Sequence, residues 1–165
     1  PAVKFDVLEK PNDWAKEIKK SDFSSETQQR RYDYWTAFQD RAFQNAEFSR
    51  EFKRRKPSTD HWMNYSIGSS ECYISVAQIR NRDELNVALY IPNNEQLYQS
   101  LESHKGEIDG EAGIPLSWYE LKGRKASKIV TARTAEFENH GEWNEQFDWL
   151  ADTMLKMKRA FKKYI

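Results

Sequence analysis

The chain shows two kinds of hydrophobic spacing, and each predicts one type of element. Apolar residues three or four positions apart predict helices at 25–45, 94–110 and 144–164, the first capped by Ser24 or Ser25. The last helix has the clearest apolar stripe, formed by Phe147, Leu150, Met154, Met157, Phe161 and Tyr164. The expected stripe of the first helix is Trp35, Phe38 and Ala42, flanked by Tyr34 and Phe43.

Apolar residues that alternate with polar ones predict five strands. They are expected at 61–68, 72–79, 84–91, 116–121 and 126–132. The links between them are short, as at Ser69-Ser70, which favours antiparallel neighbours. The expected fold is therefore α+β, a five-stranded, mostly antiparallel sheet with packed helices in the order α-βββ-α-ββ-α.

The chain is long enough for one domain with a sizeable core, because it has 165 residues. Residues 25–165 are expected to form that domain. Residues 1–24 read as an irregular linker or arm, pinned by Phe5, Val7 and Trp14. Since the sequence opens PAVKFDV without an initiator Met, we expect it to be part of a longer protein whose N-terminal module is missing here.

Charge is segregated along the chain although the formal net charge is zero. The segments 50–56, 118–133 and 156–165 hold fifteen of the 26 Lys and Arg residues, and 134–155 holds six acids without a Lys or Arg. The cations of the last segment lie away from the apolar stripe of its helix, which is typical of a solvated face. The other two basic segments are either a surface for a polyanion or well-solvated edges, and a shared surface requires them to meet in space.

Basic and aromatic residues of these two segments and of the strand between them are the candidate nucleic-acid contacts. The candidates are Arg54, Arg55, Lys56, His61, Trp62, Trp118, Arg124, Lys125 and Lys128. The cations would contact phosphates, and Trp62 and Trp118 would stack on bases. The alternative for both tryptophans is a place in the hydrophobic core. Strand alternation places Ser127 and Ile129 on one face and Lys128 on the other.

Motifs for catalysis, cofactors or metals are weak or missing. The sequence has no GxGxxG or P-loop, its three histidines lie far apart, and Cys72 is alone. Glu120-Leu121-Lys122, with Asp109 upstream, fits the Glu-x-Lys pattern of PD-(D/E)xK nucleases, but Glu17–Lys19 and Glu51–Lys53 fit it equally well. We therefore expect a chain that is not an enzyme and takes no cofactor and no metal.

The cellular compartment is predicted from the lack of membrane-spanning and export signals in the sequence. No apolar run reaches the ~18–20 residues needed to cross a bilayer. No signal peptide opens the sequence. The prediction is a cytoplasmic protein without a membrane partner.

Four stretches together resemble a known family: RRYDYWTAF, KPSTDHWMNYSIG, LSWYELKGRKASKI and WNEQFDWL. The resemblance is to an uncharacterised bacterial and archaeal domain of unknown function. That domain commonly follows an N-terminal half similar to PD-(D/E)xK nucleases, and PAVKFDVLEKPNDW is similar to the junction after it. The resemblance implies that the chain is the accessory half of a nuclease-like protein, with nucleic acid and its own N-terminal module as partners.

Two functional hypotheses follow. The first is a non-enzymatic accessory domain that binds nucleic acid or senses a target, with defence against foreign DNA as one setting. The alternative is a protein-interaction or assembly domain whose acidic segment 134–152 docks on a basic surface. DNA and RNA are both candidate ligands, and the sequence predicts no particular oligomeric state.

Overall fold

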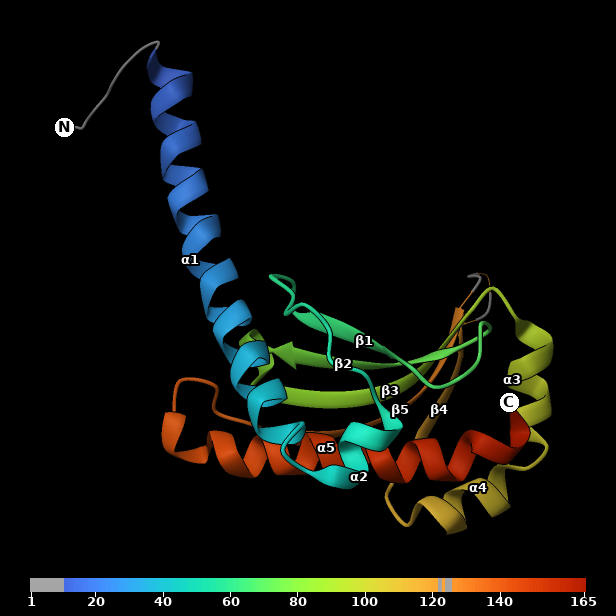
Figure 1. Cartoon of the computed structure of the whole chain (residues 1–165). Helices are drawn as coiled ribbons and strands as arrows, with labels where there is room; N and C mark the ends of the chain where they lie inside the picture. The colour runs from blue at the N-terminus through green and yellow to red at the C-terminus, as the bar shows by residue number, and fades with distance from the viewer. Residues whose placement is uncertain (1–10, 122, 124–125) are drawn as a thin grey trace.

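The fold was described from a computed structural model, which covers residues 11–121, 123 and 126–165, with side chains from Glu26 onward (Figure 1). The elements, in chain order, are α1 (Pro11–Ala42), α2 (Ala46–Glu51), β1 (Trp62–Ser66), β2 (Tyr73–Ile79), β3 (Glu84–Pro92), α3 (Glu95–Glu102), α4 (Lys105–Ala112), β4 (Ser117–Leu121), β5 (Ala126–Thr134) and α5 (Trp143–Phe161). This confirms the predicted α+β class and the five-stranded antiparallel sheet.

The strand order is β1-β2-β3-β5-β4, and every neighbouring pair is antiparallel. Tyr65, Ile74, Leu89 and Ile129 stand in register across four strands, and all are buried. Because side chains alternate between the two faces of a sheet, the residues between them form rows on the opposite face. One such row runs Asn64, Ser75, Ala88 and Val130.

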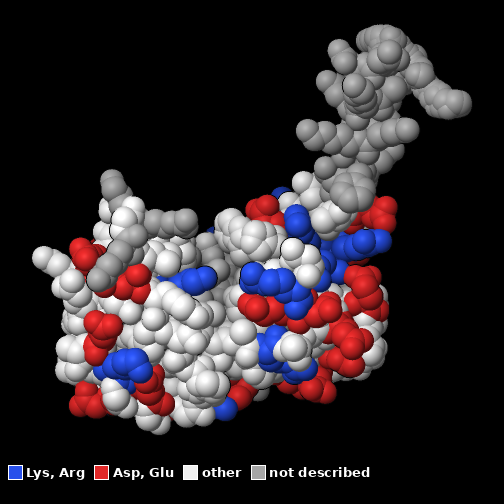
Figure 2. Space-filling model, turned by 180° about the vertical axis from the view of Figure 1, so that it is seen from behind, with Lys and Arg blue, Asp and Glu red and all other residues white. Residues whose placement is uncertain are grey.

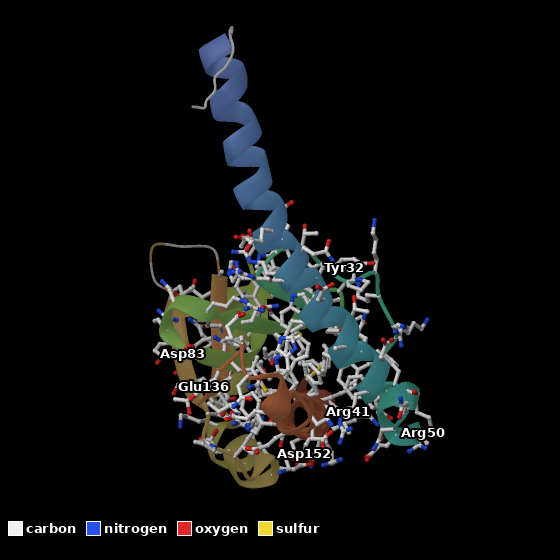
Figure 3. The ribbon with its side chains drawn as sticks, turned by 90° about the vertical axis from the view of Figure 1, so that its left-hand side faces the viewer. Tyr32, Arg41, Arg50, Asp83, Glu136 and Asp152 are labelled. Carbon is white, nitrogen blue, oxygen red and sulfur yellow. The ribbon has the colours of Figure 1, made fainter. Side chains whose placement is uncertain are left out.

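The helices pack on the face that carries the apolar rows. Figure 3 shows α5 almost along its axis, with α1 and α2 beside it. The predicted stripe of α5 is confirmed: Phe147, Leu150, Met154, Met157 and Phe161 are buried, and Tyr164 is partly buried. Side chains of this size each stabilise the fold by about 1.5–3 kcal/mol when fully buried. The core therefore lies between α5, α1 and this one face of the sheet.

Aromatic rings join α1 to α5. Tyr34 meets Phe137, Trp143 and Phe147 edge-on at ring-centroid distances of 5.0–5.3 Å. Such edge-to-face pairs add about 0.5–1.5 kcal/mol each beyond the area that they bury. The buried stripe predicted for the first helix is thus the surface through which α1 is fixed.

The first helix begins earlier than predicted, at Pro11 instead of Ser24 or Ser25. Proline suits the first helical position because its fixed φ matches the helix and its missing N–H has no partner there anyway. Lysine, glutamate and alanine residues then favour a helix through the segment that the sequence analysis took as irregular. Residues 1–10 of the expected arm lie outside the described part of the chain, and its role as a linker stays a prediction.

Two predicted helices are interrupted. The first ends at Ala42, and the Asn45 side chain then caps α2 by accepting the Phe48 N–H at 2.9 Å. The helix expected at 94–110 divides into α3 and α4 at Ser103, whose hydroxyl bonds back to the Ser100 carbonyl at 2.6 Å. Serine competes for backbone groups in this way and so favours helix ends.

Length alone does not make a membrane span in this chain. α1 has 32 residues, but within the described ranges no helix combines such length with enough apolar character to cross a bilayer.

Candidate functional site

The sheet face opposite the helices has an unusual composition for a surface in contact with water. Twenty strand residues lie on this open face: three in each edge strand, four in β2 and five in each of β3 and β5. Only Glu84 and Lys128 among them are charged, whereas 32% of the whole chain is charged. The water-facing side of an antiparallel sheet normally carries mainly polar residues, and a large uncharged surface with exposed apolar groups is typical of interaction sites.

Aromatic rings stand along the open face. Trp62 on β1 is 41% exposed and Tyr119 on β4 is 47% exposed, and they are the exposed large hydrophobic side chains of the described ranges. Between them, Tyr73 and Tyr90 are cross-strand partners whose rings stack at 5.4 Å with an interplanar angle of 26°. The ammonium of Lys128 lies 5.9 Å from the centre of the Tyr119 ring. The face thus offers flat rings with a cation among them.

Small residues in the middle of the sheet make the open face hollow. Ser75, Ala77 and Ala88 stand between the large side chains at either end. One hollow, of about 370 Å³, is lined by His61, Trp62, Asn64, Tyr73, Ser75, Ala77, Ile79, Asn86, Ala88, Tyr90 and Lys128. A second, of about 720 Å³, shares Ile79, Asn86 and Lys128 with the first and extends to Tyr119 and Arg82. The two hollows therefore form one continuous depression across the sheet.

Polar groups in the depression are suited to hydrogen bonding. Asn64, Ser75 and Asn86 line its floor. Burial, and then the neighbouring Tyr90, raise the pKa of the Tyr73 phenol, while a hydrogen bond with Asn64 opposes the shift. Tyr73 is therefore neutral at physiological pH and keeps a hydroxyl that can donate. Amides and hydroxyls of this kind can read the edges of planar heterocycles stacked on the rings.

Three of the sequence-predicted residues meet on this face: His61, Trp62 and Lys128 line the same hollow. The orientation predicted for β5 is confirmed, since Ser127 and Ile129 are buried against the helices and Lys128 is on the other face. Arg124 and Lys125 lie outside the described residues.

Trp118 is on the helix-covered face. Its indole N–H donates to Asp109 Oδ1 at 3.0 Å, and its ring lies 6.2 Å from that of Phe161. The core alternative weighed for Trp118 thus fits its position, and it is not part of the depression.

Arg54, Arg55 and Lys56 lie next to β1, on the edge of the sheet opposite to β4. The Arg55 guanidinium donates to the Asn64 carbonyl of β1 at 2.9 Å, and Arg54 pairs with Asp40. The strand order places β2, β3 and β5 between this segment and the 118–121 part of the second one. Within the described residues, Arg55 beside β1 and the 118–121 part of the second segment therefore lie at opposite edges of the sheet.

Most charges elsewhere are paired within the chain. Seen from behind in Figure 2, most Lys and Arg side chains lie beside Asp or Glu, and wide areas between them are uncharged. Four of the six acids of 134–155 take part in ion pairs, which are Arg80–Glu138, Arg133–Glu145, Arg41–Asp148 and Lys156–Asp152. Such surface pairs contribute about 0–1 kcal/mol each, but they neutralise the acidic segment.

The acids of the Glu-x-Lys pattern, Asp109 and Glu120, lie on the side of the sheet that the helices cover. Asp109 accepts hydrogen bonds from Trp118 and, at 2.9 Å, from Lys105, and Glu120 lies on the covered face of β4; Lys122 is outside the described residues. Within the described ranges, no group of three or more His, Cys, Asp or Glu side chains could hold a metal ion. Burial raises the pKa of the Cys72 thiol, which disfavours the reactive thiolate.

Sequence analysis missed the tyrosines of the open face, Tyr73, Tyr90 and Tyr119. A signal for them exists in the strand pattern. Apart from Ile79 and Glu84, the positions of 72–79 and 84–91 that alternate with the apolar set hold tyrosine, asparagine and small residues, where a water-facing strand would hold charges. Counting charges at these alternate positions would have identified the face.

Comparison with known proteins gives one match. Residues 30–165 match the model of a family described as Domain of unknown function (DUF4268). No curated protein and no solved structure matches the chain.

Proposed function

We propose that this chain, which belongs to the DUF4268 family of domains of unknown function, binds single-stranded nucleic acid on the open face of its sheet. The observation that carries the proposal is the open face itself: twenty positions with two charges, and four large aromatic side chains around a depression. Each base has a flat π-face, and stacking on an aromatic side chain contributes about 1–3 kcal/mol per base.

The single strand is favoured over a duplex by the geometry of the rings. A base can stack on Tyr73, Tyr90 or Tyr119 only when its own face is accessible, and a duplex hides its base faces inside the stack. Asn64, Ser75 and Asn86 are placed for the edges of bases lying in the depression. Lys128 would neutralise one backbone phosphate there.

The wider role that we propose is that of a non-enzymatic accessory domain. The resemblance of PAVKFDVLEKPNDW to a junction after a nuclease-like half supports a role beside such a module. A domain that holds single strands would present substrate or report a target for that module, with defence against foreign DNA as one setting. The partners proposed are therefore nucleic acid and the chain's own N-terminal nuclease-like module.

A second candidate function is protein interaction or assembly through the same face. The low charge and the exposed Trp62 and Tyr119 favour it, since aromatic residues are enriched at protein interfaces. The acidic segment 134–152 is a weaker docking element than the sequence suggested, because most of its acids pair within the chain. A single-stranded oligonucleotide would not bind at the open face under this alternative.

Fluorescence anisotropy with a labelled single-stranded 12-mer, DNA or RNA, tests the proposal. Tyr73→Ala and Tyr90→Ala are each expected to weaken binding about tenfold, the effect of losing one stacked base. Tyr32→Ala on α1, outside the open face, is the control and should leave affinity unchanged. A duplex 12-mer should bind much more weakly than the single strand. Equal affinity of both tyrosine variants and the wild type would contradict the proposal.

A further inference from the structure

A third hollow, with a different character, lies at the edge of the sheet between β1, α2 and α5. It has a volume of about 690 Å³ and is lined by Ser49, Arg50, Glu51, Phe52, Lys53, Arg54, Arg55, Ser66, Gly68 and Lys158. Five of these residues are cations and one is an acid, so the lining is strongly positive in a chain whose formal net charge is zero. A concentration of like charges in a concave site raises the local density of anions.

One cation of this hollow, Lys158, is held in place by contacts within the chain. Lys158 of α5 has a side chain only 18% exposed, and its ammonium lies 3.2 Å from the Glu51 carboxylate and 2.5 Å from the Glu51 carbonyl. It also lies 5.2 Å from the centre of the Phe52 ring. Glu51, the single acid of the lining, is thus paired with Lys158. Its negative charge is therefore compensated and does not repel an anion bound at the rim.

Three cations at the rim of this hollow are free of carboxylate partners within the described part of the chain. Among the described residues, no carboxylate forms an ion pair with Arg50, Lys53 or Arg55, whereas Arg54 pairs with Asp40. Arg50 lies at the outer edge of the molecule, on α2 (Figure 3). Cations crowded together without carboxylate partners repel one another, and a bound polyanion relieves that repulsion.

Arg55 connects this hollow to the open face. Its guanidinium is held by the Asn64 carbonyl at 2.9 Å, and the Asn64 side chain lines the depression on the sheet. Its backbone N–H is held at 3.0 Å by the buried Gln39 side chain. β1 is an edge strand, and the contact with Asn64 places the Arg55 guanidinium at this edge of the sheet.

We propose that the basic hollow beside β1 binds the sugar-phosphate backbone of the strand whose bases lie on the open face. This inference rests on the proposed function and adds to it the path of the strand. Bases would stack across β2, β3 and β4, and the backbone would pass over β1 onto Arg55, Lys53 and Arg50. Phosphodiester groups suit the site because guanidinium and ammonium groups bind them without reading sequence.

The experiment compares the salt dependence of binding in two matched variants. Arg50→Gln with Lys53→Gln removes two rim charges, and the control, Lys105→Gln with Lys163→Gln, removes two charges near α4. For a single strand, each neutralised phosphate contributes about 0.7 to the slope of log K against log salt concentration. The slope for a single-stranded 20-mer should therefore fall by about 1.4 in the rim variant and stay unchanged in the control. Equal slopes in both variants would overturn the inference while leaving the stacking proposal intact.

An oligomer of abasic deoxyribose-phosphate units separates the two proposals. It has phosphates but no bases, so it should bind weakly to the wild type and lose that binding in the rim variant. Its affinity for Tyr73→Ala should equal its affinity for the wild type. If the rim variant no longer binds the abasic oligomer, the hollow is supported as the phosphate site. If the tyrosine variants also bind the base-bearing strand with unchanged affinity, the stacking proposal for the open face is contradicted. Failure of the abasic oligomer to bind the wild type at about 50 mM salt would overturn the hollow as a phosphate site.

Discussion

At the scale of single residues, Gln39 has a larger structural role than its polar character suggests. It is fully buried on α1 and accepts from the Tyr65 hydroxyl at 2.8 Å and from the Arg55 N–H at 3.0 Å, while its amide donates to the Arg55 carbonyl at 2.6 Å. These bonds tie the end of the basic segment 50–56 to the core. The position of Arg55, which lines the basic hollow beside β1, is thus set by a buried side chain.

Replacing Gln39 with leucine should lower the free energy of unfolding by about 3 kcal/mol, because the Arg55 backbone groups and the Tyr65 hydroxyl lose buried partners. Tyr65→Phe removes one of these bonds and should cost about 1 kcal/mol. Urea unfolding measures both. A Gln39→Leu variant as stable as the wild type would show that the segment is not held in this way.

Two buried phenols predict how stability changes at high pH. Burial raises the pKa of Tyr34 and Tyr65 above the unfolded value of about 10, although nearby arginines oppose the shift. Their neutral forms are favoured in the folded state, so their contribution is complete below about pH 10 and is lost as pH rises further. Unfolding in urea at about pH 8 and pH 11 should show this loss. The decrease should be smaller in Tyr65→Phe, and an equal decrease would argue against the burial effect.

The sequence predicts the orientation of single residues correctly where hydrophobic periodicity alone determines it. It placed Lys128 opposite Ser127 and Ile129, and it found the buried stripe of the last helix. It could not place Trp118 and Trp62, because alternation gives two faces without saying which one the helices will cover. That choice depends on packing between elements distant in sequence.

At the scale of elements, α5 carries the strongest test of the core. Met154 is fully buried in the middle of its apolar stripe. Met154→Ala should destabilise the protein by about 3 kcal/mol through lost burial and the cavity left behind. Lys156→Ala, on the same helix but in a surface ion pair, should change the stability by less than about 0.5 kcal/mol. Thermal or urea unfolding that ranks these two variants the other way would contradict the packing described for α5.

Element boundaries show where sequence rules compete. The strands came close to their predicted ranges because alternation ends sharply at turns. The helix bounds differ from the predicted ones because capping residues determine where a helix begins. Asn45 caps α2 at a point where the hydrophobic periodicity alone predicts that the first helix continues. Pro11 starts a helix inside the segment that was expected to be irregular, because proline suits the first helical position.

At the scale of the whole molecule, the strand order decided which candidate surface exists. The order β1-β2-β3-β5-β4 is not contained in local patterns, because it depends on pairing between strands separated by two helices. It placed the basic segment 50–56 and the strand that begins with Ser117 on opposite edges. It also created the continuous open face, which no single strand reveals.

The proposal of a non-enzymatic domain has a direct test on the whole chain. Incubation with Mg²⁺ or Mn²⁺ and plasmid, linear or single-stranded DNA should leave the DNA intact when it is followed on a gel. Metal-dependent cleavage that vanishes in Glu120→Gln would instead assign a nuclease activity to this chain. Cleavage that persists in Glu120→Gln and stays with the protein through further purification would assign the activity to another site of the chain, such as Glu51–Lys53.

The central position of β3 has a consequence for how the chain folds. Its pairing with β2 closes a short turn, since Ile79 faces Glu84, but its pairing with β5 joins Pro92 to Ala126 and Glu84 to Thr134. Contacts between residues far apart in sequence slow folding, because the entropy of loop closure is lost before the contact forms. We therefore expect the β1–β3 meander to assemble early and the arrival of β5 to limit the folding rate. Stiffening the connection through α3 and α4 would then accelerate folding without altering either face of the sheet.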